Sequence, residues 1–299
     1  MTTKPLIILS GATAVGKTEL SIDLAKRIKG SIISADSMQV YRGFDIGTAK
    51  ISPFEMQGIP HYMIDELEPE EEFNVYEFKK RADHCIAEIL EQGRIPVITG
   101  GTGFYIQAVL YQIDFTEEPA DRFYRQHLEQ LGNLYGAEYL HRMLCDADPE
   151  AARQIHAHNR KRVIRALEFF HETGKPISLH NEEQRRKESQ YNYAYFVLNR
   201  ERSVIYERIN QRVDQMLNRG LVQEVEGLLA KGVSPDSIAM QGLGYKEIIR
   251  YLNAELTLDE AADLLKQRTR HFANAYKDPQ AQAIGCFDKV QYPDGNTTY

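Results

Sequence analysis

The sequence contains no tryptophan and only three cysteines among its 299 residues. Cys85, Cys145 and Cys286 lie far apart and form neither a CxxC pair nor a Cys/His spacing suited to zinc, so we expect reduced, buried thiols. No apolar run approaches the roughly 18 residues that cross a bilayer, and the run from Leu6 to Leu9 is too short for a secretory signal. These absences predict a cytoplasmic protein that has no contact with a membrane.

The composition is that of an ordinary globular protein, with 42% hydrophobic and 26% charged residues, which excludes disordered and collagen-like classes. A length of 299 residues suggests two domains, or one domain with a large insertion. The net charge of -7 argues against a nucleic-acid partner, but residues 153–187 hold nine Lys and Arg against four Asp and Glu, a local charge of +5. One basic segment in an acidic protein leaves a monomer as the expected state.

Short apolar runs alternate with amphipathic segments in the first third of the chain. Their spacing predicts strands over 5–9, 31–35 and 95–98 and helices over 19–28 and 75–90. Alternating units of this kind predict an α/β fold with a doubly wound parallel sheet. Later in the chain we expect a returning strand over 195–198, helices over 203–218, 221–230, 245–252 and 258–272, and an edge strand over 283–287.

Residues 116–188 break this alternation, because they offer only helical patterns. Helices are predicted over 122–131, 137–144, 149–155 and 161–172. Asn159 is suited to cap the start of the last of these helices, and Gly174 is suited to end it. We therefore predict a helical insertion domain over 116–188 in a core formed by residues 1–115 and 189–299.

Residues 11–18 read GATAVGKT, which satisfies the pattern GxxxxGK[ST] between an apolar strand and an amphipathic helix. Backbone N–H groups of such a P-loop curl around phosphate oxygens, and the helix N-terminus adds partial positive charge. Lys17 would neutralise the terminal phosphate, and Thr18 would hold Mg²⁺. A nucleoside triphosphate and a small diphosphate ester present the same oxygens, so the loop leaves the bound compound open. The predicted phosphate-binding residues are Gly11, Ala12, Ala14, Val15, Gly16, Lys17 and Thr18.

Asp36 follows the second predicted strand directly, at the sheet edge where the phosphate loop also ends. Its carboxylate has three interpretations: a partner of Mg²⁺, a general base for an incoming nucleophile, or a turn-former at the end of a strand. Ser37, Met38 and Gln39 follow it into the same cleft, and Gln39 has the donor and acceptor needed to read a base edge. An ordinary surface loop remains the alternative for these three residues.

The third strand is followed by a second glycine turn, Gly100-Gly101-Thr102-Gly103. It is not a full GxGxxG and gives little support to a dinucleotide site. Thr102 is a candidate substrate contact, and close packing of a helix on strand-terminal glycines is the alternative.

Arg208 and Arg212 are spaced i and i+4, so they share one face of a helix. Two guanidinium groups near the phosphate edge would stabilise a departing pyrophosphate. The alternative is a pair of exposed arginines bound to Glu207 or Asp214.

The basic segment contains Lys161, Arg162 and Arg165 on a predicted helix. Clustered positive charge on a small helical insertion suits the backbone of a nucleic acid, and a solvated basic face is the alternative. The histidines lack a set of partners typical of metal ligands, and we assign them no metal.

Seven blocks of the sequence together resemble one enzyme family. They are GATAVGKT at 11–18, ADSMQVYRGFDIGTAK at 35–50, IPHYMID at 59–65, RIPVITGGTGFY at 94–105, NRKRVIRALE at 159–168, YERINQRVDQML at 206–217 and GLGYKE at 242–247. The chain is similar over residues 5–272 to the bacterial tRNA dimethylallyltransferases. DSMQVYRG followed by DIGTAK is far more specific than the P-loop alone.

The resemblance implies transfer of a dimethylallyl group from dimethylallyl diphosphate to the N6 atom of an adenosine beside the anticodon of tRNA. It implies that the P-loop holds the diphosphate of this donor and not ATP, with Mg²⁺ on Thr18. Asp36 corresponds to the general base, while Thr13 and Arg212 correspond to groups around the bridging oxygen and the leaving pyrophosphate. Arg208 joins the diphosphate-binding residues. The positions that align with tRNA contacts are Ser37, Met38, Gln39, Thr102, Lys161, Arg162, Arg165, Gly242 and Tyr245.

The chain departs from the family pattern after Arg270. The family usually continues with a basic, Trp-containing segment that touches tRNA, whereas this chain reads ANAYKDP at 273–279. We therefore carry no tRNA role beyond residue 272. Three other functions are weighed against this one. They are prenylation of free adenine nucleotides, a P-loop kinase of a small metabolite in which Asp36 or Asp65 serves the metal, and a non-catalytic RNA-binding switch driven by nucleotide, which would have no use for Asp36 and Arg212 at one point.

Overall fold

The computed structural model describes residues 4–114 and 122–276. The chain divides into two compact units. Residues 1–110 and 190–299 form the sheet unit, and residues 111–189 form the helical unit. The predicted insertion spans 116–188, so the helical unit begins five residues before it and ends one residue after it.

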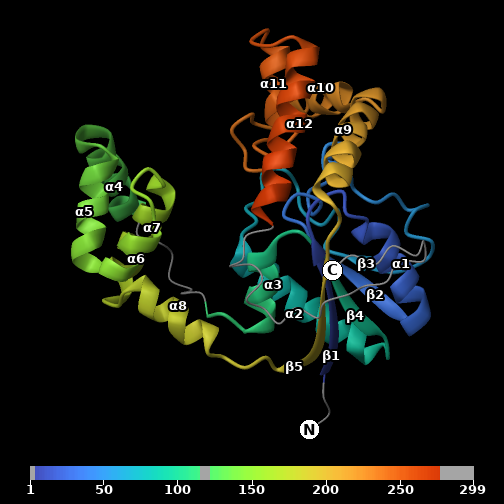
Figure 1. Cartoon of the computed structure of the whole chain (residues 1–299), viewed down its shortest axis with the longest axis horizontal. Helices are drawn as coiled ribbons and strands as arrows, with labels where there is room; N and C mark the ends of the chain where they lie inside the picture. The colour runs from blue at the N-terminus through green and yellow to red at the C-terminus, as the bar shows by residue number, and fades with distance from the viewer. Residues whose placement is uncertain (1–3, 115–121, 277–299) are drawn as a thin grey trace. The chain divides into compact units, whose positions relative to one another are not determined.

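The sheet unit contains a five-stranded parallel sheet with strand order β3-β2-β4-β1-β5. The strands are β1 (Lys4–Gly11), β2 (Gly30–Ala35), β3 (His61–Tyr62), β4 (Ile95–Gly100) and β5 (Tyr191–Leu198). Gly100 pairs with both Ser10 and Ala35, so the carboxyl ends of the three central strands are level. The predicted doubly wound parallel sheet is confirmed, and every chain segment that follows β1, β2 or β4 leaves the sheet at one edge (Figure 1).

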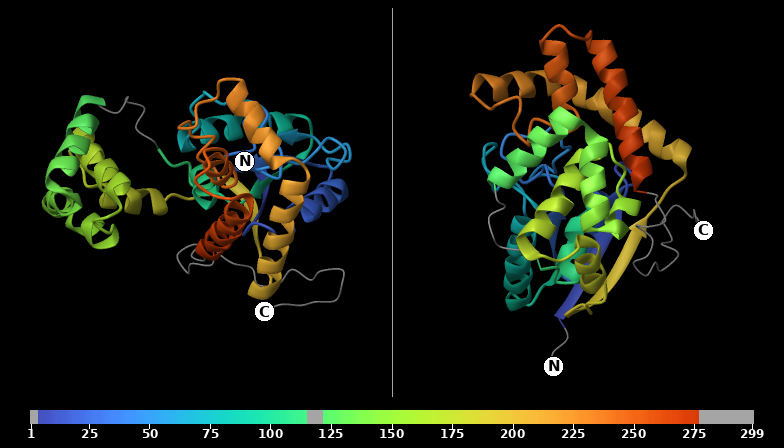
Figure 2. Two further views of the ribbon diagram at one scale, coloured as in Figure 1. Left: turned by 90° about the horizontal axis from the view of Figure 1, so that it is seen from above. Right: turned by 90° about the vertical axis from the view of Figure 1, so that its left-hand side faces the viewer.

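Helices cover both faces of the sheet (Figures 1 and 2). On one face, Ile22 and Ala25 of α1 (Lys17–Ile28) pack against Ile32 and Val97. The other face carries α2 (Val75–Glu91) and α3 (Gly103–Leu110). Helix α3 was not predicted, because its eight residues are almost all apolar and show no helical periodicity.

The second half of the sheet unit adds four helices beyond the carboxyl edge of the sheet (Figure 1). They are α9 (Arg202–Asn218), α10 (Leu221–Ala230), α11 (Tyr245–Leu252) and α12 (Leu258–Ala275), within a few residues of the predicted spans. Ile205 and Ile209 of α9 pack against Ala12 and Val15 of the P-loop. Helix α9 therefore lies directly over the phosphate loop.

The helical unit has a core of its own. It contains α4 (Arg122–Tyr135), α5 (Ala137–Ala147), α6 (Pro149–Gln154), α7 (Arg160–Thr173) and α8 (Ile177–Arg185). Leu140 and Leu144 pack with Val163 and Leu167. The predicted caps of α7 are confirmed, because the Asn159 side chain accepts the Arg162 N–H at 3.4 Å and Gly174 has a φ of 68°.

Cys85 is buried, but Cys145 is exposed, which contradicts the expectation of buried thiols: α5 turns Leu144 inward and its neighbour outward. The predicted strand over 283–287 and Cys286 lie outside the described residues. Within 4–114 and 122–276, no helix combines the length and the apolar character that crossing a bilayer requires.

Candidate active site

A cavity of about 420 Å³ opens in the sheet unit at the carboxyl ends of β1, β2 and β4. Its walls are the P-loop, the segment after β2, the glycine turn after β4, and residues of α9 and α12. The predicted site residues that line it are Thr13, Ala14, Gly16, Lys17, Thr18, Asp36, Ser37, Met38, Gln39, Thr102, Arg208, Arg212, Gly242 and Tyr245. Sequence positions more than two hundred residues apart therefore meet in one space.

The P-loop has the backbone that its glycines predict. Gly11 has a φ of 152°, and a Cβ atom there would lie 2.6 Å from the Leu198 carbonyl oxygen, so only glycine fits. Lys17 Nζ donates to the carbonyl oxygens of Gly11 at 2.9 Å and Ala12 at 2.7 Å. Burial lowers the pKa of Lys17 to about 8, the nearby Asp36 opposes this shift, and Arg212 adds to it. The ammonium group lies at the start of α1, where a phosphate oxygen would also be attracted.

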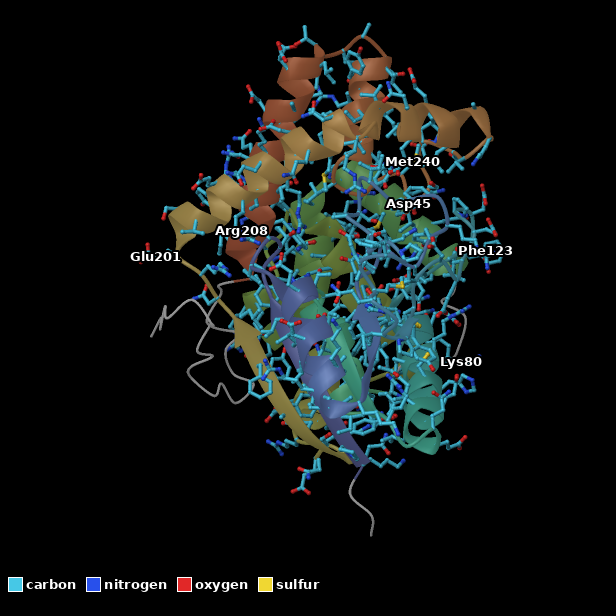
Figure 3. The ribbon with its side chains drawn as sticks, turned by 90° about the vertical axis from the view of Figure 1, so that its right-hand side faces the viewer. Asp45, Lys80, Phe123, Glu201, Arg208 and Met240 are labelled. Carbon is cyan, nitrogen blue, oxygen red and sulfur yellow. The ribbon has the colours of Figure 1, made fainter. Side chains whose placement is uncertain are left out.

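The two arginines of α9 face the phosphate loop. Arg208 Nε donates to the Ala14 carbonyl oxygen at 2.8 Å, and Arg212 Nη1 donates to Thr13 Oγ1 at 3.2 Å. Figure 3 labels Arg208 on α9. The alternative of exposed, carboxylate-bound arginines is wrong, because Asp214 pairs with Lys266 at 2.6 Å and Glu207 accepts a hydrogen bond from Gln211.

A third arginine at the loop was missed. Arg200 Nε donates to the Val15 carbonyl oxygen at 2.9 Å. Arg200 comes two residues after β5 ends at Leu198. Because the carboxyl ends of parallel strands share one edge, this position was a signal that could have identified it.

Asp36 forms the turn that one of its three interpretations predicts, and its carboxylate lies in the cavity. Its Oδ1 atom accepts the Met38 N–H at 2.9 Å, so it does form the turn at the end of β2. Its carboxylate also lines the cavity that Lys17 lines. Burial raises the pKa of Asp36, while the Met38 N–H and the charge of Lys17 act in the opposite direction. The turn orients the carboxylate, and burial makes it a stronger base than a solvated aspartate.

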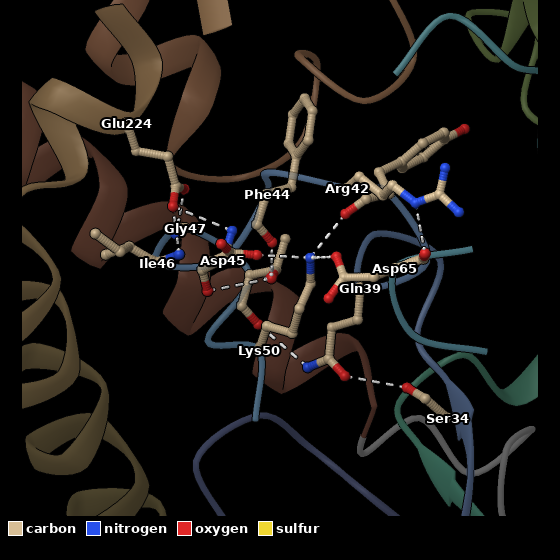
Figure 4. A network of polar contacts seen from close by, with 12 residues as sticks. Ser34, Gln39, Arg42, Phe44, Asp45, Ile46, Gly47, Lys50, Asp65 and Glu224 are labelled. Atoms are coloured by element: carbon tan, nitrogen blue, oxygen red, sulfur yellow. Dashed lines mark hydrogen bonds and ion pairs between the residues drawn. The ribbon is translucent and has the colours of Figure 1, made fainter. Parts of the chain in front are cut away.

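Gln39 is held at both ends of its amide. Ser34 Oγ donates to Gln39 Oε1 at 3.1 Å, and Gln39 Nε2 donates to the Thr48 carbonyl oxygen at 3.3 Å (Figure 4). Ser37 and Met38 are half-buried beside it. A Cβ atom on Gly242 would lie 2.7 Å from Met38 Cε, so this glycine permits close packing across the cavity.

Tyr245 is part of the cavity wall and is buried. Its hydroxyl donates to Glu224 Oε1 at 2.7 Å, and its ring centroid lies 4.7 Å from that of Phe44. Burial raises the pKa of this phenol above its ordinary value. In this structure Tyr245 supports the wall from inside, and its alignment with a tRNA contact stays a prediction.

The predicted basic surface lies on α7 of the helical unit. Lys161 and Arg162 are exposed, and Arg165 is half-buried. Arg160, in contrast, donates to Asn133 Oδ1 at 2.7 Å and to the Glu129 carbonyl oxygen, so it fastens α7 to α4. Only the first three side chains are therefore candidates for contact with a nucleic-acid backbone.

Sequence reasoning also missed an apolar wall of the cavity. The periodicity of α9 and α12 marks their apolar residues as core, whereas several of them face the cavity. These residues are Ile209, Val213, Met216, Leu265 and Phe272.

Comparisons with known proteins agree on one family. Residues 39–275 match the IPP transferase family. The chain is 60% identical over 270 residues to the tRNA dimethylallyltransferase of Lachnoclostridium phytofermentans, and 50% identical over 268 residues to that of Acetivibrio thermocellus; each alignment covers 90% of this chain and 86% of the relative.

Solved structures show the same likeness. The full-length tRNA isopentenylpyrophosphate transferase from Bacillus halodurans aligns with a TM-score of 0.70 at 44% identity, over 95% of this chain and 88% of that one. A eukaryotic dimethylallyltransferase acting on tRNA aligns with a TM-score of 0.81 at 30% identity, over 93% of this chain and 70% of that one.

The ionisation of Lys17 predicts how anion binding depends on pH. With a pKa of about 8, the free protein loses this positive charge as the pH rises through 8. Above that pH, the affinity for inorganic pyrophosphate is expected to fall by up to about tenfold per pH unit, and binding is expected to take up a proton. Titration calorimetry from pH 7 to 9.5 in buffers of different ionisation enthalpy measures both effects.

Lys17→Arg is the matched control, because arginine stays charged throughout this range. The variant reports the pH dependence that comes from pyrophosphate itself. Equal pH dependence in the two proteins would contradict a titrating Lys17.

Proposed function

This chain belongs to the IPP transferase family and is an enzyme that prenylates tRNA, and we propose that the cavity at the carboxyl edge of its sheet is the active site. The reaction transfers a dimethylallyl group from dimethylallyl diphosphate to an adenosine N6 atom beside the anticodon. One observation supports this assignment above the others: Asp36, Lys17 and Arg212 line the same cavity from three separate elements.

The P-loop end of the cavity suits the diphosphate of the donor. Lys17 and Arg212 bring positive charge to the loop, and Arg208 fastens α9 to the loop carbonyl at Ala14. Thr13, which accepts a hydrogen bond from Arg212 at 3.2 Å, would contact the bridging oxygen. As the C1–O bond breaks, the charge on the departing pyrophosphate develops where these groups already point.

The Asp36 end of the cavity suits the acceptor amine. The lone pair of an adenine N6 amine is delocalised into the ring, so the amine is a weak nucleophile. As the new bond forms between N6 and C1, a proton leaves N6, and the Asp36 carboxylate accepts it. The apolar residues of α9 and α12 would surround the dimethylallyl group and exclude water from its C1 atom.

The residues around Thr18 fit a bound Mg²⁺. Thr18 lines the cavity at the start of α1. In the described part of the chain, no three His, Cys, Asp or Glu side chains converge to form a metal site of their own. Mg²⁺ commonly takes few protein ligands together with substrate phosphate oxygens and water, so we propose that Thr18 and the diphosphate hold it. Bound Mg²⁺ would neutralise part of the pyrophosphate charge.

The target adenosine has to leave its stack in the anticodon loop, which requires a docking surface as well as a pocket. Lys161, Arg162 and Arg165 on α7 supply a basic surface for the tRNA backbone. We further propose that the enzyme acts as a monomer, because the sheet unit alone holds every residue assigned to the chemistry. We also propose that it acts in the cytoplasm, because its relatives are tRNA-modifying enzymes.

The kinase alternative loses one of its two metal candidates. Asp65 is paired with the buried Lys50 and is absent from the cavity lining. Another rival is an enzyme that prenylates free adenine nucleotides, and it has less use for the basic α7 surface.

Incubation with labelled dimethylallyl diphosphate separates these functions. Unmodified tRNA and AMP are offered in separate reactions, and we expect label in tRNA only. Label in AMP at a comparable rate would favour the nucleotide enzyme, and label in neither product would contradict both.

Asp36→Asn tests the general base. The amide keeps the shape and can still accept the Met38 N–H, but it cannot take a proton, so turnover is expected to fall by roughly 10² or more. Binding of tRNA is expected to stay within about threefold, because the proton transfer occurs only in the transition state and its loss does not weaken the binding of the substrate. Single-turnover transfer and a filter-binding assay measure the two quantities. Unchanged turnover would remove Asp36 from the mechanism.

Arg162→Ala tests the basic surface. If Arg162 neutralises one tRNA phosphate, the variant binds more weakly and the slope of log K against log salt becomes shallower by about 0.7 to 0.9. Arg153→Ala is a suitable control, because Arg153 is exposed and pairs with Glu150. An identical slope in Arg162→Ala and the unchanged protein would identify Arg162 as a merely solvated arginine.

A further inference from the structure

One carboxylate outside the cavity binds three consecutive backbone N–H groups. Glu224 of α10 accepts the N–H of Asp45 at 3.1 Å and of Ile46 at 2.7 Å through Oε2, and the N–H of Gly47 at 3.0 Å through Oε1 (Figure 4). Oε1 also accepts the Tyr245 hydroxyl at 2.7 Å. Four donors therefore converge on a side chain that comes from almost 180 residues further along the chain.

A buried cation holds the same segment from within. The Lys50 side chain is 4% exposed and donates to Asp45 Oδ1 at 2.7 Å, to Asp65 Oδ1 and to the Tyr41 carbonyl oxygen. An ammonium group has three N–H donors, and all three find acceptors here. Glu224 therefore holds the backbone of residues 45–47, and Lys50 holds the Asp45 side chain. The Ala49 N–H donates to the Ile46 carbonyl oxygen at 3.0 Å, which ties the rest of the segment to the part that Glu224 holds.

The fixed segment forms part of the cavity wall. Gly47, Thr48 and Ala49 all line the cavity. The Thr48 carbonyl oxygen accepts the Gln39 amide at 3.3 Å, and this contact decides which way the amide oxygen and nitrogen of Gln39 point. A shift of the segment would release Gln39 from this contact while leaving its bond to Ser34 in place.

We propose that Glu224 is a positioning residue for the acceptor side of the site: it holds residues 45–49 and, through Thr48, sets the Gln39 amide that reads the edge of the target adenine. This inference rests on the proposed function. The diphosphate side is built from the P-loop and α9, whereas the side-chain hydrogen bonds of Glu224 within the described part of the chain go to residues 45–47 and to Tyr245. We therefore expect its effect on tRNA and not on the diphosphate.

The chemistry requires a carboxylate at position 224. An ionised carboxylate accepts through both oxygens, and bonds from backbone N–H groups to it are strong. Glutamine has nearly the same shape but replaces one acceptor by an NH₂ donor, which would face a backbone N–H or the Tyr245 hydroxyl. Glu224→Gln thus removes one of the two acceptor oxygens and the negative charge without leaving a cavity.

Steady-state prenyl transfer by the full-length protein provides the test. In Glu224→Gln, kcat/KM for tRNA is expected to fall by about tenfold or more, because at least one of the three backbone N–H groups of residues 45–47 loses its acceptor and faces an amide donor instead. The KM for dimethylallyl diphosphate is expected to stay within about twofold. Glu226→Gln, an exposed change two residues along the same helix, is the control and should leave both values unchanged.

A double variant distinguishes positioning from general destabilisation. If Glu224 acts through Gln39, then adding Glu224→Gln to Gln39→Ala costs little more than Gln39→Ala alone, within about twofold. The proposal would be overturned if the fold-losses in kcat/KM of the two single variants multiplied in the double variant. It would also be overturned if Glu224→Gln raised the KM for dimethylallyl diphosphate as much as it lowered kcat/KM for tRNA. If Glu224→Gln fails to fold, Glu224→Asp replaces it, because aspartate keeps the carboxylate on a side chain one methylene shorter. This variant is expected to show a smaller loss of kcat/KM for tRNA, again with little change in the KM for dimethylallyl diphosphate.

The outcomes also separate this inference from the function on which it rests. Unchanged protein that transfers no label to tRNA contradicts the proposed function. If the wild-type protein transfers label to tRNA and Glu224→Gln is equally active, the result contradicts only the positioning role of Glu224.

Discussion

Lys17 and Asp36 line one cavity, and the charge of each group affects the pKa of the other; the site depends on this interaction. Burial lowers the pKa of Lys17 and raises the pKa of Asp36, so removal from water favours the neutral form of each group. The attraction between the two charges opposes both shifts. Each charge therefore favours the charged form of the other group, and the Met38 N–H adds to this effect at Asp36. The parallel sheet brings the two groups together by ending β1 and β2 at one edge.

The cations around the P-loop repel one another. Burial lowers the pKa of Arg212 and of Lys17, and a neighbouring cation adds to each shift: Arg208 at Arg212, and Arg212 at Lys17. Like charges gathered this closely destabilise the free protein, and an anion of high charge relieves the repulsion on binding. The hydrogen bonds from Arg208 to Ala14 and from Arg212 to Thr13 keep the guanidinium groups in place before the anion arrives. Binding energy is thus not needed to organise them.

Local sequence predicted the parts of this site that local chemistry determines. The P-loop glycines, the strand preceding Asp36 and the cap at Asn159 each follow from a few neighbouring residues, and all three were predicted. The orientation of Arg208 and Arg212 stayed undecided, because an i, i+4 pair shows which residues share a face but not what that face meets. Glu224 and Arg200 were missed for the same reason: their partners are backbone groups far away in the sequence. Helix α3 was missed because a uniformly apolar helix carries no periodic signal.

The segment after Arg270, where the chain departs from the family pattern, is bonded to α9. Asn274 Nδ2 donates to the Tyr206 hydroxyl at 2.7 Å, and Arg202 Nε donates to Asn274 Oδ1 at 3.1 Å. Arg270 Nη1 donates to Asn210 Oδ1 at 2.6 Å, so two successive turns of α12 are bound to α9. The apolar wall of the cavity is shared between these two helices, and its spacing depends on how they are fastened together. Asn274, which lies in the segment that departs from the family pattern, therefore helps to fasten together the two helices that share the apolar wall of the cavity.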